Sequence, residues 1–307
     1  MIGHLALAAL LQITPARPRC SVQDAAQADG SVWILCNFRD VHISADQGKT
    51  WTQSRLPQEF KHRAIAALDA QQAIVIGDQG NLWRTADRGK TWTKIAVDTE
   101  AVLTDVQFLG DLGWIGGYSG MILHSKDRGQ TWTKQPTIGS ESVESISFAD
   151  PLHGLAVGWG GAILRTVDGG AKWERVKAPA ALWSFSSVFM KDVNNAWAVG
   201  MSGQLMRTTD GGATWTAQRL EAGGSLSSVF FDKRGRGWIT SDRDIYTSPD
   251  GDKWSPSGLN DWVFLNEIIE VGGTLWAAGP LDIYRRGEKG WNRSLSPPKT
   301  SCTLLKP

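Results

Sequence analysis

The chain has 307 residues, with 32 basic and 31 acidic side chains and a formal net charge of +1. A charge so close to zero excludes the strong basic field with which proteins attract nucleic acid or an anionic membrane surface, and 41% hydrophobic with 21% charged residues is typical of a folded protein. Tryptophan is the unusual residue, because its 16 copies outnumber both phenylalanine and tyrosine. We therefore expect an architecture that requires indole side chains repeatedly.

Residues 1–17 are predicted to be an N-terminal extension or a weak export signal. Residues 5–11 form an apolar run as long as the core of a signal peptide, but no lysine or arginine precedes it. No later run approaches the ~18 apolar residues that a transmembrane helix needs. We expect residues 18–307 to form a single domain without a membrane span.

One eight-residue pattern then recurs along the chain about every forty residues. It reads Ser/Thr-x-Asp-x-Gly-x-Thr-Trp and first occurs at residues 44–51. Further full or partial copies occupy residues 85–92, 125–132, 166–173, 208–215 and 250–254, and a seventh, degenerate copy ends at Trp291. A Gly-x-x-Gly turn precedes most copies at a constant offset, as Gly77 precedes Trp92. Constant register indicates that each copy belongs to one structural unit.

Each unit contains four short segments that favour β-strands. In the fourth unit these are residues 144–148, 155–157, 162–166 and 173–176, separated by turn-forming residues. Several small sheets of this kind cannot each bury their own faces, so they stack around an axis. The pattern predicts an all-β fold, a seven-bladed β-propeller of four-stranded antiparallel blades.

The eight-residue element resembles the Asp box, or BNR repeat, of sialidase-like propellers. The whole unit, with its glycine turn before the box in seven tandem copies, resembles the photosystem II stability and assembly factor family and its bacterial relatives. That resemblance implies a monomeric, non-catalytic scaffold without cofactors, which docks an unassembled membrane-protein subunit. Family members use an arginine patch for docking. Here Arg84, Arg165 and Arg207 recur just before the box and indicate a stripe on the outer side of the ring. We therefore do not assign the docking patch to these arginines.

The aspartates of the boxes are predicted to be structural. An aspartate at a turn can accept backbone N–H groups, and repeats place equivalent residues in different blades, where they do not meet at one site. This group is Asp46, Asp87, Asp127, Asp168, Asp210 and Asp250. The five histidines fall at unrelated repeat positions, and the three cysteines form no CxxC pair. We predict neither a metal site nor catalytic residues.

A sialidase-like or other carbohydrate-active propeller is the alternative function, because such enzymes also carry Asp boxes. They use a tyrosine nucleophile with a glutamate partner and an arginine triad. The chain has three tyrosines, of which Tyr246 and Tyr284 occupy a core position of the third strand, so only Tyr118 is available. No arginine triad is recognisable.

The face of a propeller that carries the turns between second and third strands and the crossovers between blades is the expected docking face. Aromatic side chains with arginine and methionine around them are typical of protein-binding surfaces. The predicted docking residues are Tyr118, Trp159, Met201, Trp183, Phe185, Trp262, Arg63 and Arg243. For the crossover aromatics among them, packing between blades is an equally weighted interpretation. Trp159 is the strongest candidate, since it stands between two glycines that offer little to bury it.

The ring is expected to close where its two ends meet. Repeat arithmetic places Cys20 at the beginning of the first blade and Cys302 at the exit of the last, so we predict a disulfide between them, with Cys36 a free thiol. Such a bond would indicate an oxidising, extracytoplasmic compartment. Three unpaired cysteines in a cytoplasmic protein are the alternative.

Overall fold

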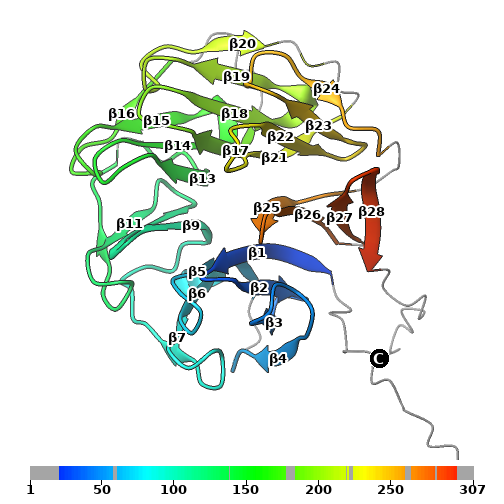
Figure 1. Ribbon diagram of the computed structural model, residues 1–307. Coiled ribbons are helices and arrows are strands. Elements are labelled where there is room, and N and C mark those ends of the chain that lie inside the picture. The colour runs from blue at the N-terminus through cyan, green and yellow to red at the C-terminus, as the bar shows by residue number, and fades with distance from the viewer. Residues whose placement is uncertain are drawn as a thin grey trace, which may run out of the picture.

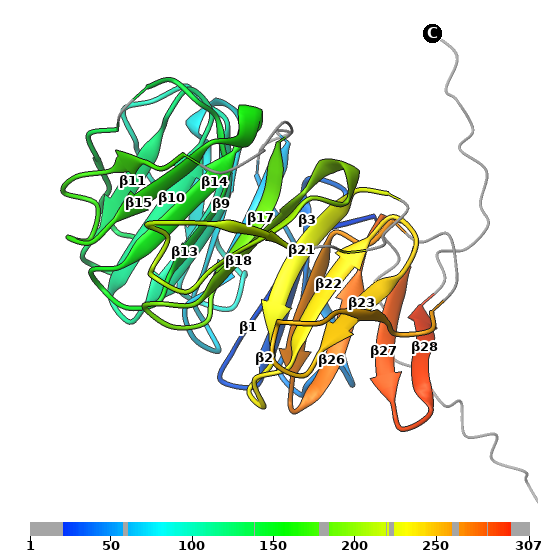
Figure 2. The ribbon, with the colours of Figure 1, turned by 90° about the horizontal axis from the view of Figure 1, so that it is seen from above.

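The computed structural model describes residues 21–57, 61–137, 139–177, 184–218, 220, 224–259, 264–280 and 282–295. Its strands form seven four-stranded antiparallel sheets arranged around a common axis (Figure 1). The prediction of an all-β seven-bladed propeller is therefore confirmed. Figure 2 shows neighbouring sheets stacked face to face, as blade 6 (yellow) is stacked on blade 7 (orange to red).

Each blade consists of four consecutive strands, from the axis outward. Blade 1 contains β1 (Val22–Ala28), β2 (Ser31–Cys36), β3 (Asp40–Ser44) and β4 (Thr52–Arg55). Blade 2 contains β5 (His62–Ala67), β6 (Ala73–Gly77), β7 (Leu82–Thr85) and β8 (Thr93–Lys94). Blade 3 contains β9 (Leu103–Leu109), β10 (Leu112–Gly117), β11 (Ile122–Ser125) and β12 (Thr133–Lys134). Blade 4 contains β13 (Val143–Phe148), β14 (Gly154–Gly158), β15 (Ile163–Thr166) and β16 (Glu174–Arg175).

The remaining blades repeat the arrangement. Blade 5 contains β17 (Phe185–Met190), β18 (Ala196–Gly200), β19 (Leu205–Thr208) and β20 (Thr216–Gln218). Blade 6 contains β21 (Leu226–Phe231), β22 (Gly237–Ser241), β23 (Ile245–Ser248) and β24 (Ser255–Pro256). Blade 7 contains β25 (Glu267–Val271), β26 (Thr274–Ala278), β27 (Ile283–Gly287) and β28 (Gly290–Leu295). Three short 3₁₀ turns, η1 (Asp78–Gly80), η2 (Trp159–Gly161) and η3 (Met201–Gly203), connect second and third strands.

Ring closure occurs by packing of blade 7 on blade 1, without exchange of a strand, because every sheet consists of consecutive strands. Trp276 and Ile283 of blade 7 share a buried cluster with Val22 and Ile34 of blade 1. The Asn266 side chain also donates to the Val22 carbonyl at 3.1 Å. The two ends of the ring therefore meet as expected.

The turns between second and third strands lie on the same face as the crossovers into the first strands. In blades 1 to 6 the first residue of this turn donates its N–H to the carbonyl of the residue before the innermost strand, as Trp159 does to Ser142 at 3.0 Å and Tyr118 to Val102 at 2.9 Å. A Cβ at Gly158 would collide with the Ser142 carbonyl, so glycine is required where these backbones meet. We call this side of the ring the loop face.

Most tryptophans occupy structural positions within the blades. The second-strand position holds Trp33, Trp114, Trp197, Trp238 and Trp276, each at most 6% exposed. Trp83 of the third strand is also buried. The seven box tryptophans lie at the hairpins between third and fourth strands. Tyr246 and Tyr284 are 7% and 3% exposed, so their predicted positions in the core are confirmed.

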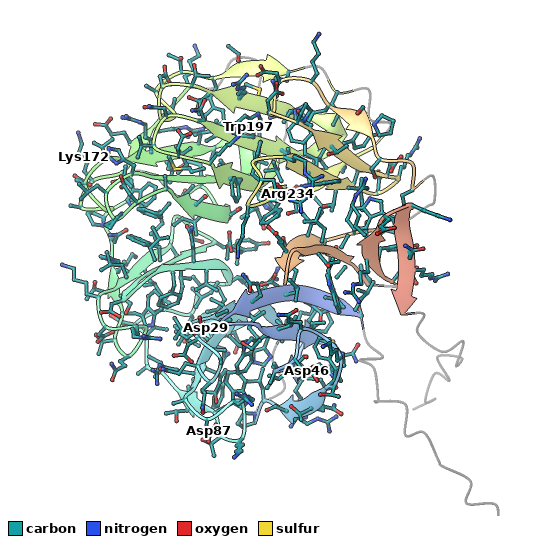
Figure 3. All side chains as sticks on the ribbon, in the orientation of Figure 1. Asp29, Asp46, Asp87, Lys172, Trp197 and Arg234 are labelled. Carbon is teal, nitrogen blue, oxygen red and sulfur yellow. The ribbon has the colours of Figure 1, made fainter. Side chains whose placement is uncertain are left out.

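Each Asp-box carboxylate bonds within its own hairpin. Asp127 accepts the Thr131 N–H at 2.9 Å and the Thr131 hydroxyl at 2.6 Å, and Ser125 donates to it at 2.8 Å. The Thr131 bonds are the main reason that the pKa of Asp127 falls to about 2. Asp46, Asp87 and Asp210 repeat this network, Asp168 and Asp250 keep part of it. Asp87 and Lys172, residues of two different boxes, lie at the outer margin of the ring (Figure 3).

The cysteine prediction needs one correction. Cys36 is buried and disulfide-bonded, so the expectation of a free thiol there is wrong. Its possible partners, Cys20 and Cys302, both lie outside the described residues. With three cysteines, a bonded Cys36 and a Cys20–Cys302 bridge are mutually exclusive.

No helix in the described part of the chain has the length and apolar character needed to cross a bilayer.

Candidate functional site

A cavity of about 580 Å³ opens within the ring, lined by the beginnings of the innermost strands. In six blades the pairing of first and second strands shifts by one residue there, which leaves one residue of the first strand unpaired. Bulges of this kind redirect a side chain. The unpaired residues are Gln23, Arg63, Thr104, Glu144, Ser186 and Ser227, and all of them line the cavity.

Four carboxyl groups line this cavity. Asp24, Asp105, Glu144 and Glu267 come from blades 1, 3, 4 and 7. Burial is the main reason that the pKa of each is raised, to about 7 for Asp24 and well above the ordinary value for Glu267. The negative charge of Asp105 raises the pKa of Asp24 further, so the groups influence one another across the axis.

The same strands connect neighbouring blades by hydrogen bonds. Asp24 accepts the Ile65 N–H of blade 2 at 2.7 Å, and Asp105 accepts the Ile146 N–H of blade 4 at 2.8 Å. In blade 4 a serine makes the corresponding bond to the next blade: the Ser145 hydroxyl accepts the Val188 N–H of blade 5 at 3.3 Å. These polar residues therefore position the blades as well as the cavity wall.

An aromatic cluster lies on the loop face at the edge of the cavity. The rings of Tyr118 and Trp159 are 5.6 Å apart, and the Arg63 guanidinium lies 5.6 Å from the Tyr118 ring. Trp159 donates its indole N–H to Glu144, which also forms a hydrogen bond with Tyr118. Arg63 is fixed by an ion pair with Asp78 at 2.6 Å. We call these residues, Arg63, Tyr118, Glu144 and Trp159, the aromatic cluster.

Three of the predicted docking residues, Arg63, Tyr118 and Trp159, are neighbours in this cluster. Trp159 is 53% exposed despite its contacts. Met201, on the next blade, is 46% exposed, and Arg243 of blade 6 is also exposed. An exposed indole beside a half-buried phenol ring can contact another protein without rearrangement of the fold.

Phe185 is a correction to the predicted set. It is 0% exposed and lies in the buried cluster between blades 4 and 5, so it cannot contact a partner. Its position, the first of the innermost strand, is buried in blades 1 to 6. Trp183 and Trp262 lie outside the described residues.

Phe38 and Phe264 are loop-face residues that were not among the predicted docking residues, at 44% and 54% exposure. Phe38 also lines the cavity and has a left-handed backbone, with φ of 61°. Bulky residues adopt this conformation at a cost of about 1–2 kcal/mol. The sequence indicates in one respect that Phe38 is exposed: it occupies the turn position that polar residues, Gln79, Ser119 and Ser202, hold in other blades.

The recurrent arginines before the boxes contact the next blade. Arg165 donates to the Gly211 carbonyl at 2.7 Å, and Arg207 forms an ion pair with Asp252. Their guanidinium groups are therefore engaged on the outer side, away from the loop face. Within the described ranges, no group of three or more His, Cys, Asp or Glu side chains has the geometry to hold a metal ion.

Comparison with known proteins gives one family. The family model described as photosynthesis system II assembly factor YCF48 matches residues 43–140 and 137–255. No curated protein matches the chain.

Solved structures share the fold at low sequence identity. A structure of YCF48 bound to D1 peptide is 21% identical with a TM-score of 0.63, covering 78% of this chain and 82% of that one. YCF48 from Cyanidioschyzon merolae is 20% identical with a TM-score of 0.69, covering 87% and 95%. An ancestral GH74 enzyme is 13% identical with a TM-score of 0.71, covering 91% of this chain but 47% of the enzyme.

Proposed function

The chain belongs to the photosynthesis system II assembly factor YCF48 family, and from this premise we propose that it is a non-catalytic scaffold that docks an unassembled membrane-protein subunit on its loop face. The observation that carries the proposal is the exposed Trp159, held beside Tyr118, Arg63 and Glu144 at the edge of a polar cavity. The structure of YCF48 bound to D1 peptide supports the class of partner.

Energetics favour a docking role for the aromatic cluster. A large indole that is 53% exposed gains free energy when a partner covers it, and its ring is already oriented by Glu144 and Tyr118. Orientation before binding lowers the entropy lost on association. Met201 and Phe264 extend the exposed apolar surface along the same face.

Replacing Trp159 by Ala should weaken binding of a D1 peptide by about 10- to 100-fold, the range of an interface hot spot. Tyr118→Ala should act in the same direction, because it removes the ring that Trp159 and Arg63 contact. Fluorescence anisotropy with labelled peptide measures the affinity, and thermal unfolding measures the fold.

Leu152→Ala is the matched control for this experiment. Leu152 is 52% exposed, nearly as much as Trp159, but lies in the turn between β13 and β14 on the opposite side of the ring. It should leave the affinity unchanged. Equal losses from Leu152→Ala and Trp159→Ala, or a melting temperature that falls together with the affinity, would contradict docking at the aromatic cluster.

A sialidase-like activity is the second candidate, and one observation favours it. Tyr118 forms a hydrogen bond with Glu144 and lies beside Arg63, which resembles a tyrosine–glutamate nucleophile pair. However, burial and the Glu144 charge raise the pKa of Tyr118, whereas a nucleophile needs a more acidic hydroxyl. Hydrolysis of a fluorogenic sialoside that disappears in Tyr118→Phe would favour the enzyme over the scaffold.

An extracytoplasmic location is part of the proposal, and the oxidised state of Cys36 supports it. We expect peptide mapping of unreduced protein to yield one disulfide-linked peptide pair containing Cys36, and titration after denaturation to yield one free thiol. Three free thiols would contradict the oxidising compartment. A Cys20–Cys302 pair with free Cys36 would restore the pairing expected from the sequence.

A further inference from the structure

The wall of the cavity carries more acidic than basic side chains. It carries Asp24, Asp105, Glu144 and Glu267, against Lys61 and Arg63. Arg63 is already paired with Asp78, and none of the four carboxyl groups forms an ion pair with a basic side chain of the described residues. Lys61 is exposed at the blade 2 edge. The centre of the cavity therefore lacks a compensating cation.

The hydrogen-bonding groups of the cavity wall also favour a cationic ligand, because they include free acceptors. Glu267 accepts from Ile268 at 2.9 Å and from the Ser228 hydroxyl at 3.3 Å, both at Oε1, so its second oxygen has capacity left. The neighbouring wall adds the hydroxyl groups of Ser186, Ser187 and Ser227. A group that donates several hydrogen bonds and carries positive charge is the complementary ligand.

His62 is an independent observation that points to the same ligand. It is 0% exposed and lines the cavity, and its Nε2 has no hydrogen-bond partner among the residues that the structure describes. Its Nδ1 contacts the Phe38 carbonyl, an acceptor, so Nδ1 carries the proton and Nε2 is a free acceptor. The equivalent position in the other blades is apolar and buried, as Leu103 and Val143 are. A polar side chain at this position is therefore unexplained by packing.

We propose that this cavity receives the cationic side chain, lysine or arginine, of the polypeptide that docks on the loop face, an inference that rests on the proposed function. Glu144 connects the two parts, since it lines the cavity and accepts from Trp159. A polypeptide held by the aromatic cluster at the cavity edge thus passes over the opening. An ammonium or guanidinium group can then donate to the second oxygen of Glu267 and to His62 Nε2, which has no partner among the described residues.

The direct probe is a capped lysine, Nα-acetyl-lysine methylamide, compared with its uncharged isostere, Nα-acetyl-norleucine methylamide. At pH 8, calorimetric titration should show the lysine compound binding at least about tenfold more tightly, as charge-assisted hydrogen bonds require. Affinity should fall as the pH is lowered from 8 to 5, because Asp24, whose pKa is raised to about 7, loses its negative charge in this range. The raised pKa values of Asp105, Glu144 and Glu267 act in the same direction. The Arg63 guanidinium, whose pKa is raised, keeps its charge in this range. Protonation of His62 acts in the same direction.

Glu267→Gln should weaken binding of the capped lysine about tenfold, and Asp24→Asn should do the same. Glu270→Gln is the matched control, because Glu270 lies on the same strand but bonds the Lys233 N–H outside the cavity. It should change the affinity less than twofold. Equal binding of the lysine and norleucine compounds, or no effect of Glu267→Gln, would overturn the inference.

Trp159→Ala separates this inference from the proposed docking function. It should weaken docking of the D1 peptide by the same 10- to 100-fold and leave binding of the capped lysine within about twofold. If the protein does not select the lysine compound but still docks the peptide through Trp159, only the inference about the cavity is wrong. If it binds the capped lysine but docks no peptide, only the proposed scaffold function is wrong. Spermidine that binds a hundredfold more tightly than the capped lysine would identify a polyamine site and overturn the peptide assignment.

Discussion

Replacing Trp114 by Ala should lower the free energy of unfolding by about 3–5 kcal/mol, the range for large buried aromatic side chains. Trp114 is 0% exposed, and its ring is stacked on Phe148 at 3.8 Å and on His124 at 5.0 Å. Its indole N–H donates to the Gly169 carbonyl in the Asp box of blade 4 at 3.1 Å. Truncation thus leaves a cavity between two blades and an unpaired carbonyl.

Chemical denaturation followed by far-UV circular dichroism measures this loss. Trp159→Ala is the control of identical chemistry, since it removes the same side chain from an exposed site and should change the stability by less than about 0.5 kcal/mol. Similar losses in the two variants would mean that the division of tryptophans between blade core and docking surface is wrong.

The fold could be predicted from the sequence because the same sequence pattern recurs in each blade of the propeller. Each box places an aspartate, a glycine and a tryptophan in one hairpin, and seven copies fix the number of blades. Trp197 and Trp238 lie in the core for the same reason, since a residue type that returns at one position in several blades reflects the blade and not a site.

The docking residues could be predicted only in part, for a physical reason. Position on a loop does not determine exposure. The sequence predicts Phe185 to be a crossover residue, but it begins β17 and occupies the buried position that Leu226 occupies in the next blade. That equivalence was present in the sequence and would have prevented the error. Trp159 was identified because the two glycines around it leave no side chains to cover it.

The cavity could not be predicted from local patterns. Its wall depends on bulges in the first strands, and the residues at those bulges, such as Gln23, Arg63 and Glu144, differ in charge and in functional group. Whether the carboxyl groups of Asp24 and Glu267 lie near each other depends on closure of the ring, which joins residues more than two hundred positions apart.

Asp24→Asn should stabilise the protein at pH 8 and not at pH 4. Burial raises the pKa of Asp24 from 3.8 to about 7, so the folded protein resists ionisation of this group. Below pH 3.8 the carboxyl is protonated in both folded and unfolded chains and has no effect. As the pH rises from there to about 7, the unfolded chain alone ionises, and the wild type loses stability.

The size of this effect follows from the two pKa values. The interval from 3.8 to about 7, at about 1.4 kcal/mol for each pH unit, corresponds to on the order of 4 kcal/mol. Asparagine avoids this penalty but has one acceptor oxygen where Asp24 uses two, for Ala25 and Ile65, and the lost bond costs about 1 kcal/mol. A net gain of about 2–3 kcal/mol is therefore expected at pH 8.

Urea denaturation at pH 4 and pH 8 tests the sign. At pH 4 the variant should be equal to or slightly less stable than the wild type, and the two should exchange order as the pH rises. A variant that is less stable at both values would contradict an ionisation penalty and leave the bond to Ile65 as the main role of Asp24. A gain at pH 8 would mean that the wild type keeps a carboxyl at a cost in stability, and that cost is the free energy that a cationic side chain in the cavity would recover.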